Sequence, residues 1–544
     1  MENQRTLLFA ALAFISVLIW QAWQDDQQVE QVVASANINS TVENNKDIPE
    51  VRSSESSADI AEPTISSSVS TGQIIKVVTD VYSLEINTEG ATINQLDLSQ
   101  YPVEKGQPEV VNILHSESPK IYMVESGLIS KDLKGPNHHT IWQTKQTNYT
   151  LSDETLDVPL YWVGENGVTV TKTYTFHRDS YKVDVVTVVE NNSSASVNVC
   201  EYVQLKHNGF EEAKQNSMIM TYTGGVLYNE EEKYQKVDFD DFVEKENARE
   251  SDAGWLAIIQ HYFVVAWIPE AGVDYHYYTK EINRRLFVIG AYSPEETINQ
   301  GTSQTFTATL FAGPKIQQQL EDLNRGVELT VDFGILTILA EPIFWLLSLF
   351  YSWVANWGVA IILVTVTIKA MFYKLSEKSY KSMARMKLVQ PRIVALKERY
   401  GDDKQQMNKA MMEMYKTEKI NPLGGCLPIL VQIPVFISLY WVLLESVELR
   451  QADFALWINN LSSPDPYFIL PVIYGITMFL QQRLNPAPAD PMQKKMMQLL
   501  PIMFTGFFAF FPSGLVLYWI VNNLLTIAQQ TYIMKKIAAG QNQK

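Results

Sequence analysis

The sequence predicts two structural parts, an α-helical membrane core and, ahead of it, a large antiparallel β-sandwich. The last third of the 544-residue chain is dominated by apolar runs, whereas residues 72–315 contain many short stretches of alternating apolar and polar residues. Alternation is typical of half-buried strands, and apolar runs of about 20 residues are typical of membrane helices. Basic residues concentrate at 374–419, between two apolar runs, which indicates a cytoplasmic loop.

Composition excludes several classes of function. The net charge of −17 argues against nucleic-acid binding, so no DNA partner is expected. Cys200 and Cys426 fall in the polar and the apolar part, so no disulfide between them is expected. All seven histidines precede the apolar third, which leaves none there for a metal site or a general base. The sequence has no GK[ST] phosphate-binding loop and no HExxH or GxSxG motif, so we expect neither an enzyme nor a cofactor.

Residues 1–24 are predicted to form a transmembrane anchor whose N-terminus is cytoplasmic. Thr6–Trp23 is long enough to span the hydrocarbon core. The alternative is a cleaved signal peptide, but the small-residue site at Ala34–Ala36 is too far beyond the apolar run for normal processing. Residues 25–71 are rich in Ser, Asn and Glu and poor in aromatic residues, which predicts a flexible linker.

Residues 72–325 are predicted to form the β-domain, closed by a short helix at Ile316–Leu323. Val168–Phe176 and Tyr181–Val189 alternate cleanly on either side of a turn at His177–Ser180. Further strands are expected at residues 261–268, 286–289 and 305–311. The histidines and acids of this part are scattered without close ligand spacing, which favours a solvated scaffold over an enzymatic or metal site.

Two neighbouring apolar runs compete for one membrane crossing. If Ile335–Val354 and residues 358–373 both crossed, the basic segment would lie on the same side as the acidic β-domain, against the positive-inside bias. Trp345 and Trp353 give the first run the aromatic residues of an interfacial helix. We therefore expect residues 326–355 to hold a helix at the outer interface, and Asn356–Leu375 to span the membrane.

Residues 356–536 are predicted to form a five-helix core, followed by a short cytoplasmic tail at 537–544. With the anchor, this makes six spans with both termini inside. Met496–Phe511 would be about 24 Å long as a helix, against about 30 Å of hydrocarbon, which indicates either frayed ends or a locally thinned bilayer. The expected spans of the core are Asn356–Leu375, Gly425–Leu444, Tyr467–Gln482, Met496–Phe511 and Leu515–Ile533.

Residues 376–419 are predicted to form a cytoplasmic helical hairpin. Met386, Val389 and Ile393 recur at helical spacing, and Gly401 is expected to end the first helix. A stripe of methionines at 407–414 follows on the second helix. The stripe is either the seam between the two helices or a soft surface for a partner.

Lys369 is the candidate functional residue in the apolar part. It lies roughly 7–8 Å inside the end marked by Lys374, so it either snorkels to the interface or lines a wet cavity. Thr365 lies one turn before it, and Gln432 lies in the middle of the next span. Polar residues also share one face of the last helix. Polar groups on three helices are costly in lipid, which favours the cavity.

Four segments carry a family resemblance: NPLGGCLPILVQIPVF, SVELRQADFALWINNLS, DPMQKKMM and FPSGLVLYWIVNN. They resemble the YidC-type membrane protein insertases, relatives of the mitochondrial Oxa and chloroplast Alb proteins. The resemblance covers about Val331 to Lys536. The anchor and the large outer domain resemble the Gram-negative form, in which that domain is a periplasmic β-supersandwich.

The resemblance implies a multi-pass inner-membrane protein that inserts nascent inner-membrane proteins and helps them fold, alone or with the Sec translocon. It implies a hydrophilic groove that is open to cytoplasm and lipid, with Lys369 as the basic residue that attracts substrate tails. Many relatives have arginine there, so bidentate recognition of a carboxylate is not implied. The tail after Lys536 is short and not strongly basic, so contact with the ribosome or targeting factors is expected at the hairpin.

The predicted site residues form three sets, with no catalytic residue and no metal ligand among them. The substrate groove is expected to contain Lys369, Thr365, Gln432, Tyr518, Trp519, Asn522 and Thr526. The apolar surface along which a substrate slides is expected to contain Cys426, Ile433, Phe436, Phe504 and Phe508. Recruitment at the hairpin is expected to use Arg392, Lys397, Arg399, Asp402, Lys404 and Met411. Two alternatives remain, an anion channel or transporter that uses Lys369, and a structural assembly factor whose outer sandwich binds a partner or a sugar.

Overall fold

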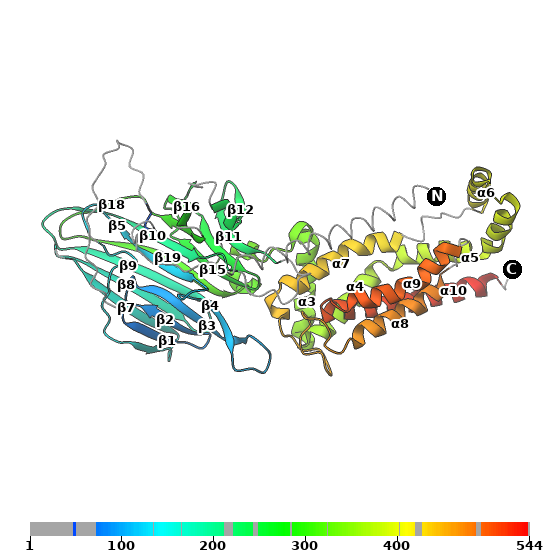
Figure 1. The fold of residues 1–544 in the computed structure, drawn as a ribbon, viewed down its shortest axis with the longest axis horizontal. Helices are drawn as coiled ribbons and strands as arrows, with labels where there is room; N and C mark the ends of the chain where they lie inside the picture. The colour runs from blue at the N-terminus through cyan, green and yellow to red at the C-terminus, as the bar shows by residue number, and fades with distance from the viewer. Residues whose placement is uncertain are drawn as a thin grey trace. The chain divides into compact units, whose positions relative to one another are not determined.

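The computed structural model divides into two compact units, which are described separately (Figure 1). Unit 1 holds the residues up to Tyr101 together with Val110–Gly313, and unit 2 holds Pro102–Glu109 and Pro314–Lys544. The predicted anchor, most of the predicted linker and Cys426 lie outside the described residues. The structure describes residues 47–49, 72–133, 135–164, 166–210, 221–242, 249–282, 285–323, 325–401, 403–418, 427–485 and 491–541.

Unit 1 is built from two β-sheets in which almost all strand pairs are antiparallel. The order of the first sheet is β13 (Arg249–Ser251), β16 (Tyr275–Ile282), β17 (Leu286–Tyr292), β10 (Val197–His207), β5 (Tyr122–Ile129), β3 (Thr92–Pro102), β2 (Tyr82–Asn87), β1 (Ile74–Val78) and β6 (Asn148–Thr150), with β18 (Glu296–Ile298) on β10 and β4 (Val110–Leu114) on β3. The order of the second is β12 (Lys233–Val237), β11 (Thr223–Asn229), β14 (Trp255–Gln260), β15 (Phe263–Pro269), β19 (Ser303–Pro314), β9 (Lys182–Asn191), β8 (Val168–His177) and β7 (Thr155–Val163).

The hairpin of β8 and β9 confirms the predicted alternation. Every second residue of β8 is buried, from Val168 to Phe176, and β9 repeats the pattern through Val183, Val185 and Val189. The register pairs Phe176 with Val183, so the apolar side chains of both strands point to one face. A pleated strand exposes alternate residues to opposite faces, and burial of one face fixes the register.

Hydrogen bonds between the two sheets show that their inner faces form one core. The Tyr82 hydroxyl on β2 donates to the carbonyl of Ala312 on β19 at 2.5 Å. The Tyr174 hydroxyl on β8 donates to the carbonyl of Ala91 at 2.6 Å, and the Trp267 indole on β15 donates to the carbonyl of Gln204 on β10 at 3.2 Å. These bonds satisfy buried polar groups that would otherwise lose their water partners. The predicted large β-sandwich is confirmed.

Unit 2 is helical after its first turns. A short helix, α2 (Gln317–Glu321), is present at the predicted position, but it belongs to unit 2 rather than closing the β-domain as predicted. Short 3₁₀ turns η2 (Val327–Thr330) and η3 (Gly334–Leu336) follow, and η5 (Val447–Leu449) comes later in the chain. The helices are α3 (Thr337–Val354), α4 (Trp357–Met371), α5 (Tyr373–Tyr400), α6 (Lys404–Thr417), α7 (Leu427–Glu445), α8 (Ile469–Leu484), α9 (Pro491–Phe508) and α10 (Ser513–Gln541).

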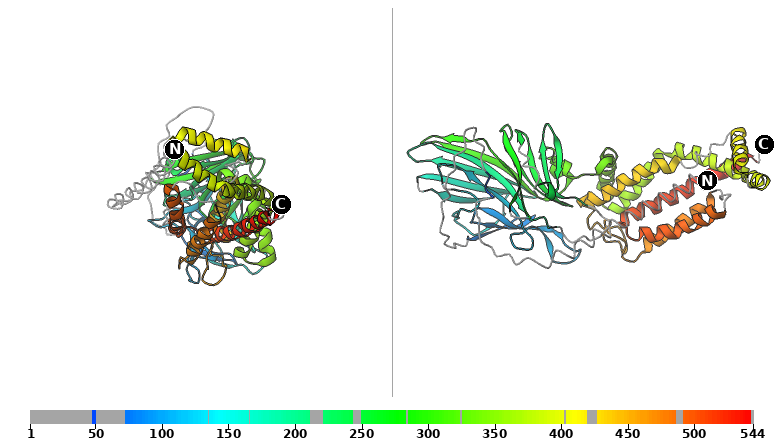
Figure 2. Two further views of the ribbon diagram at one scale, coloured as in Figure 1. Left: turned by 90° about the vertical axis from the view of Figure 1, so that its right-hand side faces the viewer. Right: turned by 45° about the horizontal axis from the view of Figure 1, so that its top comes forward.

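Helix α10 organises the bundle, because it packs against α4, α5, α7 and α8. Figure 2 shows α8 and α10 running alongside each other. Helix α3 packs on α4 and α7, and in Figure 1 it runs crosswise to them. The polar side chains of α10 therefore face several helices rather than one.

The ends of helix α9 differ from the prediction. Helix α9 begins at Pro491 and ends at Phe508, so the predicted Met496–Phe511 was placed too far along the chain. Proline tolerates the first helical position, and that start signal at Pro491 was overlooked. At 18 residues α9 is about 27 Å long, closer to the hydrocarbon thickness than was expected.

Length and composition support fewer spans in the described residues than the sequence prediction proposes. Among the described residues, Gly334–Val354 alone is long and apolar enough to cross a bilayer by itself, although the prediction places this helix at the interface. Helices α4 and α5 meet the same criteria together, with a bend of 66° between them. The count of six spans and the placement of both termini remain predictions.

Candidate functional site

Helix α4 carries the lysine that was predicted to line the groove. Asn356 caps the helix, because its Oδ1 accepts a hydrogen bond from the N–H of Val359 at 3.0 Å. The Asn356 amide also donates to the carbonyl of Phe454 at 2.8 Å. An asparagine cap satisfies an N–H that has no partner within the helix. The cap thus sets where α4 begins and places Lys369 roughly three and a half turns further on.

The Lys369 side chain reaches two other helices. Its Nζ donates to Oγ1 of Thr526 on α10 at 2.9 Å and to Oε1 of Gln432 on α7 at 3.4 Å. Gln432 Nε2 in turn donates to the hydroxyl of Tyr518 on α10. These four residues form one hydrogen-bonded group, the lysine cluster. Lys369 is only 8% exposed, so in this structure its ammonium group does not snorkel freely into solvent.

The charge of Lys369 has no counter-ion among the described residues. The ion pairs of that part of the chain do not include Lys369, and its two polar partners, Thr526 and Gln432, are neutral. A buried charge without an opposite charge is costly, and in a membrane helix it marks a functional position. Lys369 is therefore a candidate for binding an anionic group.

A pocket opens beside the lysine cluster, between the end of α4, the start of α5 and α7. Its volume is about 10 Å³, roughly the room that one water molecule needs, and its walls are mainly apolar, with Lys369 and Gln432 as polar groups. Ser376 also lines it, although the sequence did not single that residue out. The bend between α4 and α5 brings Ser376 to the pocket, and the sequence analysis did not predict that bend. The remaining lining residues are Ile368, Phe372, Leu375, Val431 and Val435.

The other predicted groove residues lie close by but do not hydrogen-bond to the lysine. The Thr365 hydroxyl donates to the carbonyl of Ile361 on its own helix at 2.7 Å. Asn522 is buried, and its side-chain oxygen has no hydrogen-bond partner among the described residues. The Trp519 ring packs against Phe436 and Phe508, with centroids 5.1 and 6.0 Å away. Trp519 thus belongs with the aromatic side chains rather than with the lysine cluster.

Aromatic side chains of α7, α9 and α10 form a continuous group beside Trp519. Phe504 and Phe508 contact each other on α9 at 6.1 Å between centroids, and Phe436 reaches the same group from α7. Ile433 is 44% exposed. Cys426, also predicted to guide substrate, lies outside the described residues. The role of these residues in sliding remains a prediction.

The helical hairpin forms as predicted, with a seam of apolar side chains. Gly401 follows α5 in the left-handed region at φ 43°, and the Asp403 carboxylate caps α6 by accepting from the N–H of Gln406 at 3.0 Å. Val389 and Ile393 are buried in the seam, against methionines of both helices and Tyr415. The prediction did not include Tyr415. Met411 belongs to this seam, which favours the structural role of the methionine stripe.

The charged residues predicted for recruitment fall on the hairpin surface where they can be described. Arg392 pairs with Glu418 at 2.6 Å and both are exposed, so the pair contributes little to stability. Arg399 is exposed. The side chains of Lys397, Asp402 and Lys404 lie outside the described residues. Recruitment through this surface remains a prediction.

The expectation that the histidines and acids of unit 1 are scattered was wrong at one place. Ligand atoms of Asp47, His138 and His139 lie within 4.8 Å of one another. Two adjacent histidines were visible in the sequence. Their carboxylate partner is about ninety positions away in the predicted linker, so local spacing could not reveal the group.

A large β-sandwich is followed by apolar helices with a buried lysine that has no ion-pair partner among the described residues. This combination is typical of a two-part membrane protein. Comparisons with known proteins identify its family. The family model of the YidC periplasmic domain matches residues 74–346, and that of the 60Kd inner membrane protein matches residues 349–541. The two family models together therefore match both the β-sandwich and the helical part of the chain.

Relatives match over almost the whole chain. This chain is 51% identical over 541 residues to the membrane protein insertase YidC of Methylococcus capsulatus, and the match covers 99% of each protein. It is 46% identical over 539 residues to the protein of the same name from Methylobacillus flagellatus, covering 98% of this chain and 97% of that one. A crystal structure described as an active YidC insertase with its first transmembrane domain resolved covers 84% of this chain and 94% of its own, at 17% identity and a TM-score of 0.37. The chain belongs to the YidC family of membrane protein insertases.

Proposed function

We propose that this chain inserts proteins into the inner membrane and helps them fold, and that Lys369 provides the charge that attracts the polar tail of a substrate. Family membership supports insertion as the activity. The observation that carries the mechanism is the buried Lys369 ammonium group, held only by the neutral Thr526 and Gln432 among the described residues.

The geometry favours a transient encounter. Two ions at 4 Å attract by about 1 kcal/mol in water and about 4 kcal/mol at the effective dielectric constant near a protein surface. The attraction between Lys369 and a tail carboxylate beside it would fall between these two values. Such an attraction draws the tail in but is weak enough to release it. A single ammonium group suits this purpose, because it does not impose the bidentate geometry of an arginine.

The apolar part of the substrate would then leave sideways. We propose that it slides along Ile433, Phe436, Phe504 and Phe508, which offer apolar surface next to the polar pocket. The cytoplasmic hairpin would recruit the nascent chain, the ribosome or a targeting factor, and the chain would act alone or with the Sec translocon. Membership of the family supports nascent inner-membrane proteins as the substrate class.

The proposed topology has six spans, both termini in the cytoplasm and α3 at the outer interface. The crosswise direction of α3 in Figure 1 supports its interfacial position. Single cysteines at three exposed positions, in a background without the native cysteines, would test it with a membrane-impermeant thiol reagent. A cysteine at Lys378 should react only from the cytoplasm, and cysteines at Leu456 and Trp353 only from outside. Labelling of Trp353→Cys from the cytoplasm would contradict this topology.

A channel or transporter for a small anion would also use a buried lysine, but the names of the relatives do not support it. Purified protein in liposomes separates the two activities. We expect insertion of a small one- or two-span substrate without ATP, measured by protease protection, and no flux of chloride or phosphate above that of empty liposomes. Anion flux without insertion would reject the proposal in favour of a channel.

A further inference from the structure

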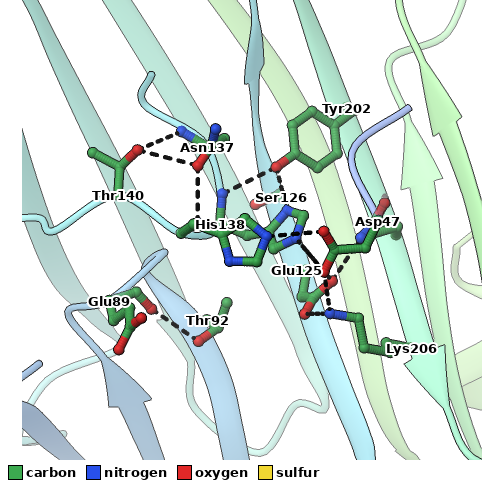
Figure 3. A network of polar contacts seen from close by, with 12 residues as sticks. Asp47, Glu89, Thr92, Glu125, Ser126, Asn137, His138, Thr140, Tyr202 and Lys206 are labelled. Carbon is green, nitrogen blue, oxygen red and sulfur yellow. Dashed lines mark hydrogen bonds and ion pairs between the residues drawn. The ribbon is translucent and has the colours of Figure 1, made fainter. Parts of the chain in front are cut away.

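Three side chains of unit 1 that can each bind a metal ion converge at one point. The insertion mechanism proposed above does not involve them. The Asp47 carboxylate lies with Oδ2 3.0 Å from Nε2 of His138 and with Oδ1 2.9 Å from Nε2 of His139 (Figure 3). Asp47 comes from the segment before the first strand, whereas the histidines follow β5. We call these three residues the Asp47 cluster.

The turn that carries the histidines is firmly held. The Asn137 side-chain oxygen accepts from the N–H of His139 at 2.9 Å, and the Thr140 carbonyl accepts from the N–H of Gly90 at 2.7 Å. Gly90 has φ 77°, and a Cβ there would lie 2.2 Å from the carbonyl oxygen of His138, so only glycine lets the two backbones approach. The histidine positions are thus set by the fold rather than by contact with Asp47.

His138 is oriented in the way that metal-binding histidines usually are. Its Nδ1 lies 2.5 Å from the hydroxyl of Tyr202, which also accepts from the His138 backbone N–H at 3.0 Å. A hydrogen bond at one ring nitrogen fixes the ring and points the other nitrogen at the ion. The other nitrogen, Nε2, faces two carboxylates, at 3.0 Å from Asp47 Oδ2 and 3.7 Å from Glu125 Oε2, and the His138 side chain is only 1% exposed.

A second carboxylate and one ammonium group lie beside the Asp47 cluster. Lys206 Nζ contacts Asp47 Oδ2 at 2.8 Å and Glu125 Oε1 at 2.6 Å, so one ammonium group serves two carboxylates. Glu125 is 2% exposed and Lys206 7% exposed.

We propose that Asp47, His138 and His139 bind a divalent transition-metal ion of the zinc type. Imidazole nitrogens and a carboxylate oxygen are common zinc ligands at about 2.0–2.2 Å, and the separations within the cluster fit atoms that share one such ion. Lys206 occupies Asp47 Oδ2, which leaves Oδ1, beside His139, for the metal. The ion would add a positive charge beside the Asp47 and Glu125 carboxylates, which share the ammonium group of Lys206.

Metal binding would join Asp47–Pro49 to the sandwich. Pro49 is itself buried, so this segment already packs on unit 1. A metal bond to Asp47 would add to the ion pair of Asp47 with Lys206 and to the burial of Pro49. The ion would therefore act as a clip between the start of the chain and the periplasmic-type domain.

The test uses the full chain, purified in detergent without a histidine tag, stripped with a chelator and titrated with Zn²⁺ against a competing indicator. We expect one tight equivalent per chain, and binding at least about 100-fold weaker in Asp47→Asn and in His139→Ala. His177→Ala is the matched control, because His177 pairs with Asp184 at 2.8 Å on the same unit but lies outside the cluster. That variant should bind as the wild type does.

A second measurement separates loss of binding from loss of folding. Zn²⁺ should raise the thermal unfolding midpoint of the stripped wild type and of His177→Ala, but not that of His139→Ala, since only binding to the folded state stabilises it. The proposal is overturned if the stripped wild type binds no stoichiometric Zn²⁺. It is equally overturned if Asp47→Asn and His139→Ala bind as tightly as the wild type, or if His177→Ala loses binding.

Discussion

A buried ion pair at the end of α7 gives a sharp prediction about stability. Lys315 Nζ donates to Glu445 Oε2 at 3.1 Å and to the Thr330 carbonyl at 3.2 Å, and the two side chains are 2% and 8% exposed. Lys315→Met leaves the Glu445 carboxylate buried without a cation, which typically costs about 3–5 kcal/mol. Local opening of this region should then become at least about 100-fold more frequent, since 1.4 kcal/mol is about tenfold.

Hydrogen exchange of the amides at Leu329 and Val331 measures that opening directly. Lys315→Met and Glu445→Leu should each accelerate exchange. The double variant should exchange more slowly than either single one, because it leaves no buried charge. Single variants that exchange at the wild-type rate, or a double variant whose effect is the sum of the two, would refute the reasoning.

Three further predictions follow from other parts of the chain. Burial, with a smaller contribution from His115, lowers the pKa of His207 to about 3, and its Nδ1 accepts from the N–H of Gly209 at 2.8 Å, so the folded state disfavours the charged ring. The free energy of unfolding should therefore fall as pH drops from about 6.5 toward 3, by about 2 kcal/mol at pH 5. This loss should be seen as faster amide exchange in β10 at low pH, and His207→Gln should remove the part of it that comes from His207. Asp465 accepts from Trp457 Nε1 and from the N–H groups of Tyr467 and Leu470 at 2.9, 3.0 and 2.7 Å, so Asp465→Ala should destabilise the loop before α8 by about 3 kcal/mol, seen as faster exchange at Leu470; unchanged exchange would contradict this. Deleting Gln405–Lys416 should impair crosslinking of nascent chains while the protein stays folded in the membrane, and normal crosslinking would count against the hairpin as the recruiting surface.

Much of the fold could be predicted from local patterns. Alternation located β8 and β9 because each buries one face, and Gly401 ended α5 because glycine tolerates a positive φ. Family segments identified the helical part. The start of α9 was misplaced because a proline at the first helical position was not treated as a start signal.

The site was predictable where polar residues interrupt apolar helices. Lys369, Gln432, Thr526 and Tyr518 were chosen because each is costly in lipid, and the structure brings these four together. Trp519 was also predicted to line the groove, but its ring packs with aromatic side chains instead. Ser376 was missed because its place in the pocket depends on the bend between α4 and α5.

Contacts between distant segments were beyond local patterns. Asp47 meets His138 across about ninety positions, and Lys315 meets Glu445 across 130. In both cases the residue types were visible in the sequence, but only the packed chain brings the partners together.

The central claim is that the charge of Lys369 attracts the substrate tail, and one comparison tests it most directly. Proteoliposome insertion would be measured for two substrates that differ only in having an acidic or a neutral translocated tail. Lys369→Met should slow the acidic substrate at least about fivefold, from an attraction of 1 kcal/mol or more, and leave the neutral one unchanged. Lys369→Arg should retain activity, and Lys374→Met is the control, since Lys374 is exposed. Equal rates for wild type and Lys369→Met with the acidic tail would contradict the account.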